Sequence, residues 1–222
     1  MPYFKKDFFD FLKELSQNNN REWFAENKTR YELSVKIPFE EFIQDVILRI
    51  HEIDDSITVS AKDSIFRIYR DVRFSKDKKP YKEQVSGIIC EGGRKNYTVP
   101  GTYIEIHHDN WKIYGGAYFI DSKLLQNLRE YILSNMEEFN SLINDKKFKK
   151  VYGELHGEKH KRLPKEFVEA AKKQPLLFNK QFYFFDRLEP KKLLSKNVVD
   201  LVMDHYHIAR PLSLFLQEGM RG

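Results

Sequence analysis

The chain has 222 residues, of which 41% are hydrophobic and 14% aromatic, and its formal net charge is +5. This composition excludes a disordered chain, and the modest charge excess does not by itself indicate a nucleic-acid-binding protein. No apolar run approaches the roughly 18 residues of a membrane span, and the N-terminus lacks the pattern of a secretory signal. Because the single cysteine, Cys90, cannot form an internal disulfide, we expect a cytoplasmic protein that spans no membrane.

Residues 1–56 are predicted to be helical. Apolar residues recur at helical spacing from Phe4 to Leu15. Asn20 can cap the next helix, and Pro38 suits the first turn of a third, where a missing N–H costs nothing. The apolar stripe of that third helix consists of Phe39, Phe42, Ile43, Val46, Ile47 and Ile50.

Residues 57–120 are predicted to form a mainly antiparallel sheet. Runs rich in β-branched and aromatic residues alternate there with turn-forming residues. The Asp109-Asn110 pair suits a two-residue hairpin turn, since both residue types tolerate positive φ. The predicted strands are 57–59, 64–74, 84–90, 102–108 and 111–119.

Residues 121–222 are predicted to be mostly helical. They contain one lone strand at 181–185 and then a long C-terminal helix, which Pro211 should kink or break. Helices followed by strands and again by helices indicate an α+β fold, with both sets of helices packed against the central sheet. No linker of Gly, Ser and Pro separates the blocks, so we expect a single domain over 1–222.

The positive charge is concentrated in residues 66–82, FRIYRDVRFSKDKKPYK. This segment has seven Lys or Arg residues and two acidic ones, so its net charge is 7 − 2 = +5, equal to that of the whole chain. If 64–74 is a continuous strand, Arg70 shares a face with Phe66, Ile68, Val72 and Phe74. An arginine on an apolar face must be paired, so we expect Arg70 to be mostly buried and bonded to a carboxylate or carbonyl outside its strand.

The predicted hairpin at 102–119 has one unusually polar face. The opposite face of the 64–74 run carries Arg67, Tyr69, Asp71 and Arg73, and a sheet-floor pocket would result if the two polar faces adjoin. An ordinary solvent-exposed sheet face shows the same alternation. The polar face of the hairpin consists of Tyr103, Glu105, His107, Lys112, Tyr114 and Tyr118.

A spacing motif, R-x-x-R-D-x-R-F-x-x-x-D-K-x-x-Y, runs from Arg67 to Tyr81. It resembles the hallmark of a bacterial family of about this length, domain of unknown function 2461. The segments NNNREWF at 18–24, PFEEF at 38–42 and KRLPKEF at 161–167 are also similar to that family. The resemblance covers nearly the whole chain and implies a single full-length domain, but it implies no particular reaction.

Binding of an anionic ligand is the function that these residues favour. The ligand would be a phosphate-bearing small molecule, such as a nucleotide, or a nucleic acid, and tyrosines between the cations could stack on bases. A second basic cluster, Lys159 to Lys165, could extend the positive surface. The expected ligand-binding residues are Arg67, Arg70, Arg73, Lys78 and Tyr81.

Two alternatives explain the same residues. One is a phosphoester hydrolase, possibly metal-dependent, that uses Asp71, Glu105 and His107 as acid–base or metal-holding groups. The other is a structural arginine network in a protein that acts through a protein interface. The segment HGEKH at 156–160 does not match the HExxH metal motif, so no metal site is predicted from its histidines. No nucleotide-binding glycine motif is present, and the sequence identifies no cofactor.

Overall fold

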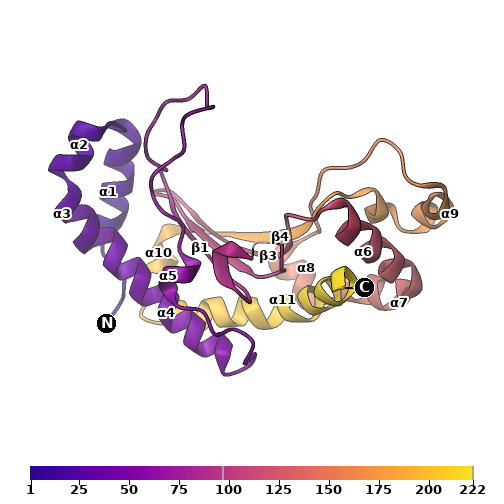
Figure 1. The fold of residues 1–222 in the computed structure, drawn as a ribbon. Coiled ribbons are helices and arrows are strands. Elements are labelled where there is room, and N and C mark those ends of the chain that lie inside the picture. Colours follow the sequence, from indigo (N-terminus) through magenta and orange to yellow (C-terminus); the bar gives the residue numbers. More distant parts are fainter. Residues whose placement is uncertain (97, 222) are drawn as a thin grey trace. The chain divides into compact units, whose positions relative to one another are not determined.

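The computed structural model describes residues 1–96 and 98–221 and has an α+β architecture (Figure 1). A four-stranded antiparallel sheet has the strand order β1-β2-β3-β4, with helices before and after it in the sequence. The predicted fold class is therefore confirmed. The strands are β1 (Val85–Ile89), β2 (Thr102–Ile106), β3 (Trp111–Ala117) and β4 (Phe182–Leu188).

Helical segments account for most of the remaining chain. Those before the sheet are α1 (Lys6–Gln17), α2 (Arg21–Glu26), α3 (Lys28–Tyr31), the π-helical turn η1 (Glu32–Lys36), α4 (Ile37–His51) and α5 (Ala61–Ser64). Those after β1 are η2 (Gly93–Lys95), α6 (Ser122–Ser134), α7 (Met136–Ile143), α8 (Lys146–Tyr152), α9 (Lys165–Lys173), η3 (Pro175–Phe178), α10 (Pro190–Leu193) and α11 (Val198–Arg221).

The chain folds into two compact units. Unit 1 consists of Met1–Lys95, Tyr103–Ile113 and Arg187–Met203. Unit 2 consists of Asn96–Thr102, Tyr114–Asp186 and Asp204–Gly222. Both units draw residues from β3, β4 and α11, and the single domain expected from the sequence stays a prediction.

Unit 1 has a core built largely from helices α1 and α4. The side chain of Asn20 accepts a hydrogen bond from the Trp23 N–H at 2.9 Å and caps α2, as predicted. Pro38 lies in the first turn of α4. The predicted apolar stripe of α4 is buried, together with Phe8, Phe11, Leu12 and Leu15 of α1.

Unit 2 has a core in which helices cover one face of its sheet residues. Ala117, Phe182 and Phe184 point into this core and meet aromatic and aliphatic side chains of α6, α7, α8 and α11. Gly116 allows β3 and β4 to approach, because a Cβ there would lie 2.2 Å from the Phe182 carbonyl oxygen and its φ is +88°. Glycine inside a strand often marks a close approach, and here another strand makes it.

The β2–β3 hairpin is confirmed, but its turn differs from the prediction by one residue. The His107 N–H donates to the Asn110 carbonyl oxygen at 2.8 Å, so His108 and Asp109, rather than Asp109 and Asn110, form the two-residue turn. In this register Glu105 lies opposite Lys112. The alternation of faces is unchanged, since Ile104, Ile106, Trp111 and Ile113 are buried.

Two other expectations are wrong. Residues 57–59 form no strand, and the helix does not break at Pro211, because α11 continues through that residue, while a kink there stays a prediction. A proline in a helix removes one hydrogen bond, and the apolar residues of α11 compensate by packing, Leu212, Phe215 and Leu216 being buried around it.

Cys90 follows β1 directly and is buried, 1% exposed, with burial raising the pKa of its thiol to about 11. Cys90 is therefore a packing residue of unit 1. Among the described residues, no helix is long and apolar enough to cross a membrane.

Candidate functional site

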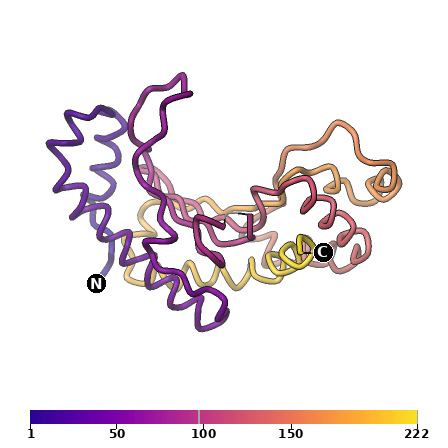
Figure 2. Tube along the Cα trace, in the orientation of Figure 1, coloured from indigo at the N-terminus to yellow at the C-terminus, as the bar shows by residue number. Residues whose placement is uncertain are grey.

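Residues 66–82, which we call the arm, are not the continuous strand predicted for 64–74. The segment pairs with neighbouring chain only at isolated bridges, Ile65 with Gly87 and Tyr69 with Tyr81. The Tyr69–Tyr81 bridge consists of two backbone hydrogen bonds, Arg70 N–H to Pro80 O and Lys82 N–H to Ile68 O, both at 2.8 Å, which hold the two limbs of the arm together. Figure 2 shows the arm as one excursion of the chain between α5 and β1.

The base of the arm is anchored to the N-terminal helices. Tyr81 is buried and stacks on Phe24, with ring centroids 4.0 Å apart and an interplanar angle of 16°. The side-chain amide of Asn19 accepts from the Tyr81 N–H and donates to the Tyr81 carbonyl oxygen, both at 3.1 Å. Tyr81, predicted to bind ligand, therefore packs inside unit 1, and Asn19 is a residue that the sequence patterns did not reveal.

Arg70 ties the two limbs together near the tip. Its guanidinium donates to the Asp77 carboxylate at 2.6 Å and to the Lys79 carbonyl oxygen at 3.2 Å. Both partner types predicted for Arg70 are present, and its side chain is 28% exposed, mostly but not fully buried. The hydrogen bond from Arg70 lowers the pKa of Asp77.

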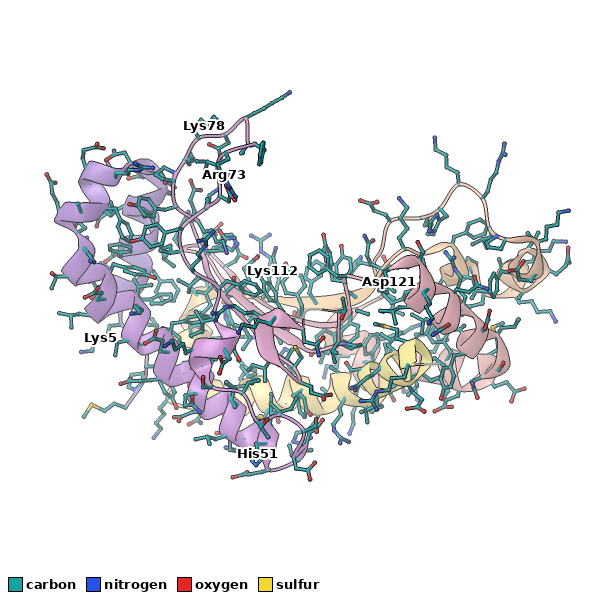
Figure 3. All side chains as sticks on the ribbon, in the orientation of Figure 1. Lys5, His51, Arg73, Lys78, Lys112 and Asp121 are labelled. Carbon is teal, nitrogen blue, oxygen red and sulfur yellow. The ribbon has the colours of Figure 1, made fainter. Side chains whose placement is uncertain are left out.

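Two other residues of the motif bond within the tip. Arg73 makes a bidentate pair with Asp71, at 3.0 and 2.6 Å, and this bond lowers the pKa of the Asp71 carboxyl. Lys78 donates to the Val72 carbonyl oxygen at 3.0 Å. These three charged side chains are exposed, and Figure 3 shows Arg73 and Lys78 at the end of the arm.

Phe74 lies at the tip and is 95% exposed, although the alternation predicted it on a buried face. The Arg73 guanidinium carbon lies 5.9 Å from the centre of its ring. Exposed cations surround this ring in the sequence: Arg67, Arg73, Lys76, Lys78 and Lys79. The turn-forming run SKDKKP after Phe74 is the signal that could have placed this ring in a loop.

A second polar group, the Glu105 cluster, lies on β2 and β3 in unit 1 and consists of Tyr103, Glu105, His107 and Lys112. The Tyr103 hydroxyl donates to Glu105 at 3.2 Å, and His107 Nε2 lies 3.1 Å from the Glu105 carboxylate. Lys112 Nζ lies 3.9 Å from the same carboxylate. Burial of Glu105 raises its pKa, but the His107 hydrogen bond and the charges of His107 and Lys112 outweigh burial and lower it.

The base of the arm adjoins the Glu105 cluster. Lys82 Nζ lies 5.2 Å from the Phe66 ring centre, and the Phe66 and Tyr103 rings are 6.1 Å apart. Burial lowers the pKa of Lys82, the charge of Arg67 lowers it further, and Glu105 opposes the shift. Of the polar face predicted for the arm, Tyr69 contacts Phe24 and Tyr81 instead, and the adjacency of Arg67 to the Glu105 cluster stays a prediction.

The three residues of the hydrolase alternative have different partners. Glu105 and His107 are in contact with each other, while the Asp71 carboxylate is bonded to Arg73 in the arm. Within residues 1–96 and 98–221, no group of three or more His, Cys, Asp or Glu side chains could hold a metal ion. The HGEKH segment includes no helix, and His156 pairs with Tyr183 at an isolated bridge.

The comparisons with known proteins identify a family and no activity. No curated protein matches the sequence. The family model described as "Conserved hypothetical protein (DUF2461)" matches residues 7–215, which include the arm, the Glu105 cluster and most of both units. The chain therefore belongs to the family of domain of unknown function 2461, as the resemblance of its central motif implied.

Proposed function

We propose that the chain binds nucleic acid through the tip of the arm. The observation that carries this proposal is Phe74, an aromatic ring 95% exposed among the exposed cations of the arm. Proteins that bind single strands combine cations along the phosphates with aromatic side chains on which bases stack. Phe74 supplies the stacking surface, while Arg67, Lys76 and Lys78 supply positive charge.

The bonds within the arm are compatible with this role. Arg70 bonds to Asp77 and to the main chain, so it keeps the two limbs in place. The Arg73–Asp71 pair is exposed, and exposed ion pairs contribute little to stability. Arg73 can therefore exchange Asp71 for a phosphate at small cost.

A polymer fits the arm better than a free nucleotide does. Small-molecule sites are concave and bury most of the ligand's surface. The cations of the arm are instead exposed on a projecting segment, and the buried tyrosine of the motif, Tyr81, is covered by Phe24.

The two alternative functions explain the structure less well. A hydrolase would need Asp71 beside Glu105 and His107, whereas the Asp71 carboxylate accepts hydrogen bonds from Arg73 in the arm. A structural network accounts for Arg70, but it leaves the exposure of Phe74 unexplained.

The salt dependence of binding tests the proposal. For a single strand, the logarithm of affinity falls with the logarithm of salt by about 0.7 per phosphate contact. Binding is measured by fluorescence anisotropy with a labelled oligonucleotide of about 12 residues. The double variant Lys76→Ala/Lys78→Ala should reduce the magnitude of the slope of log affinity against log salt by about 1.4, because it removes two phosphate contacts. Phe74→Ala should weaken binding and leave the slope unchanged, because stacking releases no counterions.

The control removes the same charge elsewhere in unit 1. Lys5 and Lys6 are exposed at the start of α1, so Lys5→Ala/Lys6→Ala matches the arm variant in net charge. Its salt slope should equal that of the unchanged protein. Equal slopes for the arm variant and this control, together with an unchanged affinity of Phe74→Ala, would exclude the arm as the binding element.

A further inference from the structure

Unit 2 has a set of contacting aromatic rings on the sheet face opposite its core. The Tyr114 and Phe185 rings lie 5.1 Å apart, and the Tyr118 and Tyr183 rings 5.2 Å apart. His156 lies 5.7 Å from Tyr183 and 5.1 Å from Phe185, so it joins the two pairs. We call these five residues the aromatic face.

Strand alternation explains why these rings share a face. Ala117, Phe182 and Phe184 point into the core of unit 2, so the neighbouring positions of β3 and β4 point away from it. His156 extends the face beyond β4, because its N–H donates to Tyr183 O at 2.7 Å and its carbonyl accepts from Tyr183 N–H at 3.2 Å.

The aromatic face remains partly open to solvent. Tyr118 is 53% exposed, and Tyr114, His156, Tyr183 and Phe185 are half-buried. A core tyrosine would be covered, whereas these rings present both apolar surface and polar groups. Aromatic groups arranged in this way provide stacking surfaces for planar ligands.

A basic segment follows the aromatic face directly. Residues 158–165, which we call the basic loop, contain four Lys or Arg residues and one acidic residue. Backbone pairing fixes the start of this loop, since the His160 N–H donates to Phe178 O at 2.8 Å and Lys159 pairs with Asn179. Figure 1 shows the loop leading into α9. Its exposed cations are Lys159, Lys161, Arg162 and Lys165.

The local charge at the start of the loop is positive. Lys180 pairs with Glu158 at 3.1 Å, which occupies the one acidic side chain of the loop. Arg129 is buried and donates to two carbonyl oxygens, of Leu177 and Asn179, at 2.9 and 3.3 Å. Burial lowers the pKa of His160, and the charges of Arg129 and Lys180 lower it further.

We infer that unit 2 has its own binding face for single-stranded nucleic acid, separate in residues from the arm. Bases stack on Tyr118 and Tyr183, while Lys159, Lys161 and Arg162 contact the phosphates. Both glycans and nucleic acids can stack on tyrosine rings, and the cations of the basic loop favour nucleic acid. A neutral glycan needs no cations, whereas each phosphate of a nucleic acid gains from one.

Photo-crosslinking locates the contact without relying on affinity. The full chain is irradiated with an oligonucleotide of about 12 residues that contains bromouridine, and the crosslinked peptides are identified by mass spectrometry. We expect crosslinks at Tyr118 or Tyr183. Crosslinks at Phe74 report on the arm separately, so failure of one site is distinguishable from failure of the other. If Tyr118 and Tyr183 remain uncrosslinked while Phe74 crosslinks, the inference for unit 2 is wrong and the arm proposal stands.

Affinity measurements separate stacking from charge. Tyr118→Ala should weaken binding of the oligonucleotide about tenfold and leave binding of an abasic strand with the same number of phosphates unchanged. Lys159→Ala/Lys161→Ala/Arg162→Ala should flatten the salt slope. Lys146→Ala/Lys147→Ala/Lys150→Ala, on exposed positions of α8, removes the same charge from unit 2 and should have no such effect.

Two results would overturn the inference. One is that the triple variants of the basic loop and of α8 have the same salt slope, while Tyr118→Ala binds the oligonucleotide with unchanged affinity. The other is binding of a neutral oligosaccharide that Tyr118→Ala abolishes while oligonucleotide binding is unaffected. Circular dichroism of each variant checks that the fold is retained, and Tyr118→Phe, which keeps the ring, should bind like the unchanged protein.

Discussion

The three arginines of the arm differ in how many of their N–H groups are already bonded. Arg70 donates to a carboxylate and a carbonyl, and Arg73 donates to both oxygens of Asp71. Arg67 has no hydrogen bond or ion pair to another residue of the described chain, 1–96 and 98–221. At this scale, Arg67 is the guanidinium best able to gain a partner from a ligand, while Arg70 serves mainly to hold the loop.

Glu105 should stabilise unit 1 in a pH-dependent way. Its folded-state pKa lies below the ordinary value, so its contribution is present above about pH 4.3 and is lost as pH falls through the folded-state pKa. Glu105→Gln should lower the free energy of unfolding at pH 7 by about 1–3 kcal/mol, because the carboxylate is only 16% exposed and bonds to His107 and Tyr103.

Urea titrations of the unchanged protein and of Glu105→Gln measure the difference in their free energies of unfolding. They are carried out at pH 7 and at about pH 3.5, which is below the ordinary pKa of Glu. The gap should shrink at the lower pH. Glu41→Gln, at an exposed position on α4, is the matched control and should show a small effect at both. A gap that is as large at low pH as at pH 7 would mean that the side-chain change acts through packing and not through charge.

The arm is the element whose conformation depends most on a few polar contacts. The backbones of its limbs meet at one isolated bridge, made of two hydrogen bonds, and its base depends on Asn19 and on the Tyr81–Phe24 stack. Segments with few backbone bonds open locally at low free-energy cost. The arm should therefore exchange its amide hydrogens faster than β1, which immediately follows it.

Asn19→Ala should loosen the arm selectively. The change removes both hydrogen bonds to the Tyr81 main chain, each worth about 1 kcal/mol, while the buried Tyr81 ring still packs on Phe24. Hydrogen-exchange mass spectrometry should show faster exchange in peptides covering 66–82 and unchanged exchange in α6 and α11. In the control Asn18→Ala, the lost bond goes to Glu14 O within α1, so the arm should be unaffected. Unchanged arm exchange in Asn19→Ala would contradict the anchoring role.

Sequence patterns predicted the long elements well and the arm poorly, for a physical reason. The helices around Phe8 and Phe42 and the β2–β3 hairpin have many apolar residues at one period, so packing and local preference agree. In the arm, Asp71 accepts from the Arg73 N–H and Asp77 from the Lys79 N–H, which turns the backbone away from a ladder. The alternation of 64–74 was real in the sequence, but local side-chain bonds to the backbone outweighed it.

The sequence indicated the cations of the candidate site but not the contacts that hold the site in place. The concentration of charge in 66–82 was visible because like charges recur in one segment. The contact of Asn19 with Tyr81 joins residues that are distant in sequence. The contact of Glu105 with Lys112 depends on the register of the hairpin. A shift of one residue in the predicted turn paired Glu105 with the wrong neighbour.

At the scale of the whole molecule, shared elements connect the two units covalently. Strands β3 and β4 and helix α11 each supply residues to both. Because a strand or helix rarely loses half its hydrogen bonds independently, we expect the chain to unfold in one transition, as a single domain would.

Two optical probes test this cooperativity. Both tryptophans, Trp23 and Trp111, belong to unit 1, so their fluorescence reports on that unit alone. Far-ultraviolet circular dichroism reports on the helices of both units. The two signals should change at the same urea concentration. Separate midpoints would show that the units unfold independently and would contradict the single domain.

The burial of Cys90 makes site-specific labelling of this protein straightforward. Thiol reagents attack the thiolate, and a pKa of about 11 leaves only about one native thiol in 10⁴ ionised at neutral pH. A cysteine introduced at an exposed position of the arm, as in Lys76→Cys, would react with a maleimide dye far faster than Cys90. The arm can thus carry a single fluorophore or spin label while the native cysteine stays in place.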